Sequence, residues 1–170
     1  MTITEQNIRA LIEHYRLQPH PEGGYYVQTY RSSELLHEEC LPIRYPGERC
    51  FSTAILFLLG GRDFSAFHRI KSDELWHFHS GSALNIYVIS PENGFSLITL
   101  GSRFDLGQEF QAVVKAGNWF ASAPVDPEGY SFVGCTVSPG FEFEDFEMAN
   151  AAELSEHYPE HRELIHRFCR

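Results

Sequence analysis

Four side chains that can exchange protons lie close together in the sequence, namely His68, Glu74, His77 and His79. Histidine titrates near neutral pH, so imidazoles beside a carboxylate can carry out general acid–base chemistry. Alternate side chains of a β-strand share one face, so His77 and His79 would share a face opposite that of Glu74. We therefore predict that His68 and Glu74 are the catalytic candidates.

The spacing around these two residues resembles the first metal-binding motif of the cupin superfamily, which supplies two His and one Glu and ends in Gly. His68 lies six residues before Glu74, and six residues separate Glu74 from Gly81. Two positions depart from the pattern, because Ile70 stands where the second His belongs and Phe120 where the second motif supplies the last His. A transition metal normally needs three or four N, O or S ligands. The usual metal site is thus expected to be lost, and we predict no metal and no cofactor.

His77 and His79 could rebuild a metal site with His68 only if a β-bulge turned them inward. Without a bulge they would face outward, to pack at a dimer interface or reach water. A metal-dependent enzyme with a repaired ligand set therefore remains an alternative.

The two ends of the chain have helical patterns. Apolar residues at helical spacing from Ile8 to Tyr15 predict an amphipathic helix within residues 1–18, with Thr4 as its N-cap. A second apolar stripe predicts a C-terminal helical segment over residues 150–170. The chain as a whole, residues 1–170, is predicted to be one domain.

Residues 20–147 carry short apolar or alternating runs separated by Gly, Pro, Asn and Asp, which is typical of antiparallel strands. The predicted strands are Tyr25–Tyr30, Phe51–Leu59, Phe64–Ile70, Leu75–His79, Leu84–Ile89, Phe95–Leu100, Phe110–Val114, Trp119–Ala123, Tyr130–Val137 and Phe141–Phe146. Since no long helix lies between them, an all-β sandwich or barrel is favoured over a βαβ fold. Residues 32–49, rich in charge, are predicted to form a long excursion.

The composition limits the classes of binding partner that we expect. The 170 residues carry a net charge of −10, with no basic cluster that could neutralise a phosphate backbone, so nucleic acid and anionic membranes are not expected as partners. No apolar run is long enough to span a bilayer, and the N-terminus lacks the order of a signal peptide. The four cysteines form no CxxC pair and are predicted to be free thiols in a reducing compartment. We expect a cytoplasmic protein.

Three separated motifs extend the resemblance to nearly the whole chain. They are His20-Pro-Glu-Gly-Gly-Tyr-Tyr26 with Thr29-Tyr-Arg-Ser32, then Ser72-Asp-Glu-Leu-Trp-His-Phe-His79, and finally Val137-Ser-Pro-Gly-Phe141 followed by Phe143-Glu-Asp-Phe146. Together they resemble a cupin-like family of uncharacterised bacterial and fungal proteins. The resemblance implies a double-stranded β-helix, the cupin jelly roll of dTDP-sugar epimerases, usually assembled as a homodimer. It implies no activity, because the family has no settled one.

Several polar and aromatic side chains are candidate ligand contacts inside such a barrel. An aromatic lining suits a planar or sugar-like ligand, although core packing would explain any single ring equally well. Arg31 could pair with a ligand carboxylate or with a surface Glu, and the turn at residues 21–24 could approach a ligand or simply lead into the first strand. The candidates are Tyr26, Arg31, Trp76, His77, Phe78, His79, Tyr87, Trp119, Phe120 and Asp145.

Four functions remain open. The first is an uncharacterised small-molecule-binding protein, with His68 and Glu74 at the floor of its pocket and Trp76 and Trp119 on the walls. The second is a metal-free sugar-nucleotide epimerase or isomerase, with His68 as base, Glu74 or Asp145 as its partner, and a tyrosine as acid (Tyr26, Tyr87 or Tyr130). The third is the metal-dependent enzyme, and the fourth a non-catalytic dimeric scaffold.

Overall fold

The computed structural model describes residues 2–170. Helix α1 (Ile3–Tyr15) opens the chain and ends at Arg16, which adopts the left-handed conformation. The predicted N-cap is wrong: Thr2, rather than Thr4, caps the helix. Thr2 is extended and exchanges hydrogen bonds with Glu5 in a capping box, whereas Thr4 is already helical, so its backbone cannot serve as the cap.

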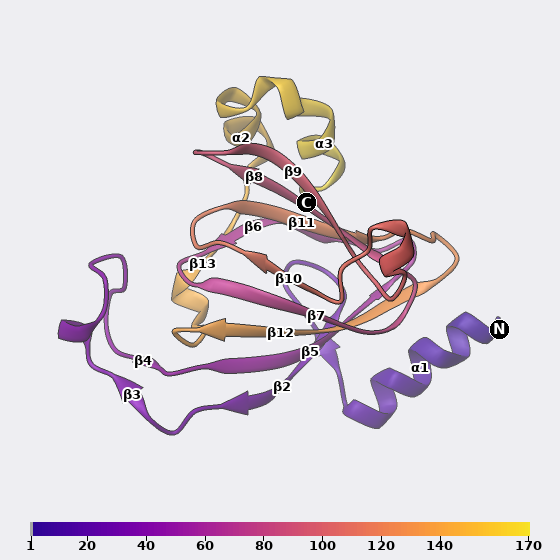
Figure 1. Ribbon diagram of the computed structural model, residues 1–170, viewed down its shortest axis with the longest axis horizontal. Helices are drawn as coiled ribbons and strands as arrows, with labels where there is room; N and C mark the ends of the chain where they lie inside the picture. The colour runs from indigo at the N-terminus through magenta and orange to yellow at the C-terminus, as the bar shows by residue number, and fades with distance from the viewer. Residues whose placement is uncertain (1) are drawn as a thin grey trace.

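Two antiparallel sheets face each other and form the barrel, as Figure 1 shows. The first sheet has the order β1-β2-β5-β12-β7-β10, and the second has the order β13-β6-β11-β8-β9. The first comprises β1 (Gln18–Pro19), β2 (Tyr25–Arg31), β5 (Thr53–Gly60), β7 (Asp73–Gly81), β10 (Gln111–Val114) and β12 (Tyr130–Ser138). The second comprises β6 (Ser65–Ile70), β8 (Leu84–Ser90), β9 (Gly94–Leu100), β11 (Trp119–Pro124) and β13 (Phe146–Met148). The predicted all-β jelly roll with helices at its ends is confirmed.

The excursion predicted over residues 32–49 contains a small ribbon that projects from one end of the barrel in Figure 1. In it, β3 (Leu35–Leu36) pairs with β4 (Arg49–Cys50), and a 3₁₀ turn, η1 (Glu38–Cys40), follows β3. The strand predicted over Phe141–Phe146 is wrong. A 3₁₀ turn, η3 (Phe143–Asp145), replaces half of it, because Asp145 turns toward a buried Arg49 rather than joining a ladder.

Helices cover the outer faces of both sheets. Helix α1 packs on the first sheet against an apolar cluster that includes Leu58 and Phe132. The second sheet is covered by α2 (Ala151–His157) and α3 (Arg162–Arg167), with the 3₁₀ turn η4 (Pro159–His161) between them. One further 3₁₀ turn, η2 (Phe104–Leu106), precedes β10. Within residues 2–170, no helix combines the length and apolar character that crossing a membrane requires.

Apolar side chains fill one part of the space between the sheets. Trp76, Phe120, Ile86 and Val133 belong to this cluster, and each is at most a few per cent exposed. The other part, toward the His20 loop and η3, is hollow and carries polar side chains.

Candidate functional site

The hollow part of the barrel is a cavity of about 270 Å³. Aromatic and aliphatic side chains form most of its wall, and several titratable groups lie among them. The lining residues are His20, Glu22, Tyr26, Gln28, Thr53, Ile55, Phe57, His68, Ile70, Glu74, Cys135, Val137, Phe141, Phe143 and Phe146. None of these described lining residues is Lys or Arg.

A tight loop before β2 brings His20 and Glu22 into the cavity. The backbone N–H of His20 donates to Gly24, and that of Gly23 donates to His20. Gly23 and Gly24 both have positive φ, and a Cβ on Gly23 would collide with the carbonyl oxygen of Phe64, so only glycine fits there. The loop is therefore a fixed support for the two side chains it carries.

The carboxyl group of Glu22 contacts two of the other titratable groups. Its Oε2 lies 3.2 Å from Nε2 of His68 and 3.3 Å from Nδ1 of His20. Its Oε1 accepts a hydrogen bond of 2.9 Å from the hydroxyl of Ser65. Because Glu22 is buried, desolvation raises its pKa, an effect that His20 and the Ser65 hydroxyl oppose.

His68 is almost fully buried, at 2% exposed. Its Nδ1 lies 2.7 Å from the carbonyl oxygen of Ala66, which fixes the Nδ1–H tautomer, and its Nε2 faces Glu22. The ring packs 4.1 Å from that of Phe120, measured between centroids. Burial lowers the pKa of His68 to about 4. With Nδ1–H donated to Ala66, a neutral His68 directs the lone pair of Nε2 toward Oε2 of Glu22.

Glu74 faces the same cavity from β7. Burial, together with the nearby Glu22, raises the pKa of Glu74 to about 8, while the Cys135 thiol acts weakly in the opposite direction. Burial and the two carboxyl groups raise the pKa of Cys135 as well, so this thiol is a poor nucleophile. At neutral pH, Glu74 is therefore largely a neutral carboxylic acid, which can donate a hydrogen bond.

The turn η3 closes one wall of the cavity with aromatic rings. Phe141, Phe143 and Phe146 lie within 6.2 Å of one another between centroids, and Phe143 stacks on His20 at 6.1 Å. Phe143 is half-exposed, at 52%, so it forms part of the boundary with solvent.

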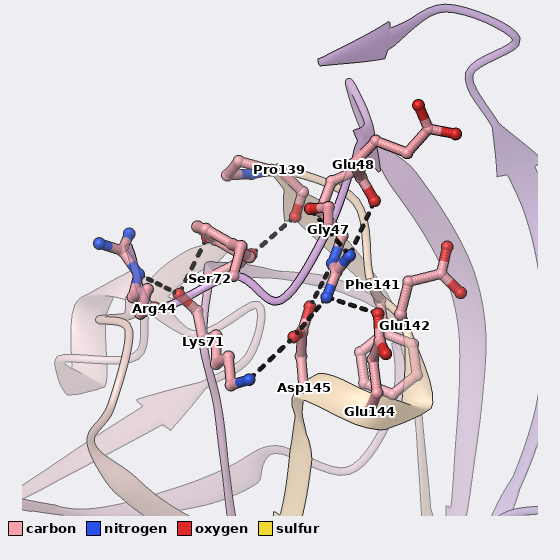
Figure 2. A network of polar contacts seen from close by, with 12 residues as sticks. Arg44, Gly47, Glu48, Lys71, Ser72, Pro139, Phe141, Glu142, Glu144 and Asp145 are labelled. Atoms are coloured by element: carbon pink, nitrogen blue, oxygen red, sulfur yellow. Dashed lines mark hydrogen bonds and ion pairs between the residues drawn. The ribbon is translucent and has the colours of Figure 1, made fainter. Parts of the chain in front are cut away.

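A buried ion-pair network anchors this turn. Arg49 donates to both carboxylate oxygens of Asp145 at 2.7 and 2.8 Å, and it contacts Glu144 at 2.7 Å. Figure 2 shows how Glu144, Asp145 and the carbonyls of Gly47 and Glu48 converge on this guanidinium group. The bidentate geometry fixes η3, and with it the aromatic wall.

The structure brings several of the predicted residues to the cavity or its floor. His68, Glu74 and Tyr26 line it. Trp76 and Phe120 do not line it; they are buried in the packed cluster, where their rings lie 6.3 Å apart. Phe78 packs against the same cluster as a partly buried ring. The prediction that Trp76 forms a wall of the cavity is therefore corrected. Trp76 shares the inward face of β7 with Glu74 but lies two residues further along the strand, beyond the cavity.

Other predicted residues lie on the outer faces of the sheets, away from the cavity. Trp119 lies under Arg69 on the outer face of the second sheet, and Tyr87 stacks on Phe168 there, so the predicted Trp119 wall is also corrected. Strand parity explains both placements, since their neighbours on β11 and β8 point inward.

His77 and His79 also face outward. His77 lies 3.2 Å from the hydroxyl of Thr136 and 3.1 Å from the amide of Gln111. A register shift against Phe132 does make His79 an extra residue in β7, as in a bulge. The bulge does not turn it inward, because its ring packs 5.9 Å from Phe132, between centroids, on the face that α1 covers.

Two side chains that were predicted to contact a ligand form ion pairs within the protein instead. Arg31 pairs with Glu142 at the surface, which is the surface partner considered above. Asp145 forms ion pairs with Arg49 and, at 3.5 Å, with Lys71, and so is not the partner of His68. Among the tyrosines considered as acids, Tyr130 packs on the α1 side, and Tyr26 alone of the three lines the cavity.

Sequence reasoning missed His20 and Glu22 as site residues. The stretch His20-Pro-Glu-Gly-Gly was interpreted mainly as a turn into the first strand, and that turn is present. A usable signal existed: a His and a Glu two residues apart, followed by two glycines, on a loop that must pack closely. Within residues 2–170, no three His, Cys, Asp or Glu side chains are arranged to hold a metal ion.

Comparison with known proteins identifies the family of the chain. The profile of a cupin superfamily family, DUF985, matches residues 9–149. The chain belongs to this family. A crystal structure of a protein from Shewanella oneidensis is similar at 38% identity and a TM-score of 0.82, with 94% of this chain and 95% of that one covered. A hypothetical protein from Leishmania major is similar at 34% identity and a TM-score of 0.84, covering 95% and 97%.

More distant structures share the fold alone. Oxalate decarboxylase from Bacillus subtilis is similar at 11% identity and a TM-score of 0.54, over 92% of this chain and 38% of that one. No curated protein matches the chain. The comparisons therefore confirm the resemblance to an uncharacterised cupin-like family and give no substrate.

Proposed function

We propose that the protein binds a small, uncharged organic molecule in the barrel cavity. The ligand has an aromatic or apolar body and one hydrogen-bonding end. The observation that carries this proposal is the composition of the cavity wall, which combines aromatic rings with the His20, Glu22, His68 and Glu74 group. Concave sites with apolar walls and a few convergent polar groups are typical of small-molecule sites.

The volume supports a small ligand. Pockets for drug-sized molecules enclose about 300–1,000 Å³, and this cavity of about 270 Å³ lies just below that range. A single-ring compound matches it. A sugar nucleotide could place only its sugar inside.

The charges support a neutral ligand. Burial raises the pKa of Glu22 and Glu74 and lowers the pKa of His20 and His68, so all four groups tend toward their uncharged forms. An anionic ligand would lose its hydration without gaining a Lys or Arg partner among the described lining residues.

Three probes of similar size and different charge test the proposal: benzamide, benzoate and benzamidinium. Binding is measured by chemical-shift changes at pH 6.5. Benzamide should bind at least tenfold more tightly than benzoate, a difference of about 1.4 kcal/mol. Equal or tighter binding of benzoate would overturn the proposal.

A matched pair of variants locates the binding. Val137→Phe fills the cavity and should abolish the benzamide shifts, while Val113→Phe, on an exposed position of β10, should leave them unchanged. Native mass spectrometry of the purified protein complements the probes, because a natural ligand that co-purifies should be lost in Val137→Phe.

A second candidate is the metal-free epimerase or isomerase. The contact between His68 and Glu22, with Tyr26 on the same cavity, favours it. The carboxyl partner of His68 would then be Glu22. Deuterium incorporation from solvent into a dTDP-4-keto sugar is its assay, and a rate equal to that of buffer at high protein concentration counts against it.

A further inference from the structure

The loop before β2 determines which nitrogen of His20 carries the proton. The backbone N–H of Glu22 donates a hydrogen bond of 3.3 Å to Nδ1 of His20. An imidazole nitrogen that accepts a hydrogen bond carries no proton, so a neutral His20 has its proton on Nε2. Burial lowers the pKa of His20, with Glu22 opposing this effect and His68 adding to it. The neutral ring is therefore favoured, and its Nε2–H group is a hydrogen-bond donor.

This donor has no partner within the protein. Among residues 2–170, every polar contact of the His20 ring is made through Nδ1, and none through Nε2. The side chain is only 7% exposed, and the ring lines the cavity. A buried donor without an acceptor loses its hydration and gains nothing in return. An acceptor on a ligand inside the cavity would remove that cost.

The other polar groups beside His20 are engaged with one another. Oε1 of Glu22 accepts from Ser65, and Oε2 of Glu22 faces the Nε2 lone pair of His68 at 3.2 Å. Burial raises the pKa of Glu22, which favours a protonated carboxyl group that can donate to this lone pair. Glu74, largely protonated at neutral pH, adds a second donor to the cavity wall. His20 is thus the imidazole that is left to contact a ligand.

The orientation of the His20 ring is fixed from several sides. Tyr26 lies edge-on at 4.5 Å between centroids, and Phe143 stacks at 6.1 Å. Glu22 cannot move away from Nδ1, because Ser65 holds its side chain and the N–H of Ala66 donates to its backbone oxygen. A donor that is fixed in direction before the ligand arrives gives specificity at a low entropic cost.

We propose that His20 is the specificity-determining residue of the cavity, that its Nε2–H group donates a hydrogen bond to the ligand, and that the ligands are aromatic carbonyl compounds whose oxygen accepts it. The inference rests on the proposed function, because it assigns the hydrogen-bonding end of that neutral ligand. A molecule of the same shape without an acceptor would leave the donor buried and unpaired, so the cavity discriminates against it.

The first test compares acetophenone with α-methylstyrene, in which a C=CH₂ group replaces the C=O group. A wall without a donor would prefer α-methylstyrene, because a hydrocarbon group leaves water more readily than a carbonyl group does. The full-length protein should instead bind acetophenone at least about fivefold more tightly. Chemical-shift titration at pH 6.5 measures both affinities. Equal or tighter binding of α-methylstyrene overturns the inference.

The second test observes the proton directly. Long-range ¹H–¹⁵N correlation spectra distinguish the two neutral tautomers of an imidazole, because protonated and unprotonated ring nitrogens resonate far apart. His20 should show a protonated Nε2 and an unprotonated Nδ1. Acetophenone should shift the Nε2 resonance more than α-methylstyrene does. A proton on Nδ1, or equal shifts with the two probes, overturns the inference.

Variants assign the preference to His20. His20→Phe keeps an aromatic ring beside Tyr26 and Phe143 but has no donor, so the ratio of the two dissociation constants should change about tenfold in favour of α-methylstyrene. His20→Leu serves if this variant fails to fold. The control is His37→Phe, whose imidazole lies 3.9 Å from Glu48 on an exposed site, and it should leave the ratio unchanged. An unchanged ratio in the His20 variants overturns the inference.

The outcomes separate this inference from the proposed function. If benzamide binds but acetophenone has no advantage over α-methylstyrene, the role of His20 is overturned and the proposed function stands. If benzamide, acetophenone and α-methylstyrene all fail to bind, both proposals are overturned.

Discussion

The two ends of the space between the sheets are built from the same strands but held together differently. Strand β7 runs through both: Glu74 borders the cavity, and Trp76, two residues later on the same face, packs against Phe57 and Phe120. At the packed end, apolar burial supplies the stability. At the cavity end, two carboxyl groups and two imidazoles are buried among apolar side chains, which costs stability unless each is hydrogen-bonded.

The contrast indicates where function resides. A barrel that needed only to fold would continue the packed cluster to its other end. Instead, a glycine loop, an aromatic turn and a buried Arg49 hold open a polar cavity. Regions that keep unfavourable buried groups in place are candidates for binding or catalysis. Substitutions at the packed end should therefore affect stability alone, and those at the cavity end should also affect ligand binding.

The largest loss of stability should come from the packed end. Trp76→Ala removes a ring that is 1% exposed and should lower the free energy of unfolding by about 3–5 kcal/mol. Trp76→Phe is the matched control and should cost much less, because the buried indole N–H has no hydrogen-bond partner in residues 2–170. Urea denaturation measures both. A loss below about 1 kcal/mol for Trp76→Ala would contradict the division into two ends.

The second-largest loss of stability should come from Arg49, which anchors the aromatic wall of the cavity. Arg49→Ala leaves Asp145 buried with Lys71 as its remaining cation, and removal of one partner of a buried pair costs about 3 kcal/mol. Ligand binding should fall more than stability alone explains, because η3 carries the aromatic wall. Arg31→Ala, which breaks a surface ion pair with Glu142, should cost below about 1 kcal/mol and serves as the control.

The pH dependence of stability should arise at the cavity end, where Glu74 and His68 are buried. The pKa of Glu74 is raised to about 8 in the folded state, so the folded protein holds a proton that the unfolded chain releases, and stability falls as pH rises toward 8. His68, with its pKa lowered to about 4, gives the opposite slope between about pH 4 and its ordinary value of 6.5. The two slopes oppose each other below pH 6.5, so a net loss should appear between about pH 6.5 and 8.

The size of this loss is about 2 kcal/mol, at about 1.4 kcal/mol per pH unit. Glu74→Gln should remove the loss and leave the slope of His68 exposed below pH 6.5. Urea denaturation from pH 5 to 8.5 measures it. A wild-type curve that stays flat above pH 6.5 would show that Glu74 is ionised or solvated in the folded protein.

Much of the barrel could be predicted because strand alternation is a local property. The inward placement of Glu74 and the outward placement of His77 follow from parity along one strand. The cavity could not be predicted in the same way. Glu22, on the loop before β2, contacts Ser65, which lies 43 residues later in the chain, and also His68 on the same strand as Ser65. No local spacing in the sequence encodes these contacts. The N-cap prediction was wrong because Thr2 and Thr4 are the same residue type near the start of the helix, and only the backbone geometry shows which of them is the cap.

The smallest effect on stability should come from the rim of the cavity. Phe143 is 52% exposed, so Phe143→Ala should cost about 1 kcal/mol or less, far below the loss for a buried ring. Its stacking on His20 predicts a larger effect on ligands than on folding, with benzamide affinity reduced several-fold and release accelerated. Stopped-flow dissociation measures the release. If Phe143→Ala left both affinity and release unchanged, the aromatic turn would be part of the fold alone, and the contrast between the two ends would reduce to the polar residues of the cavity.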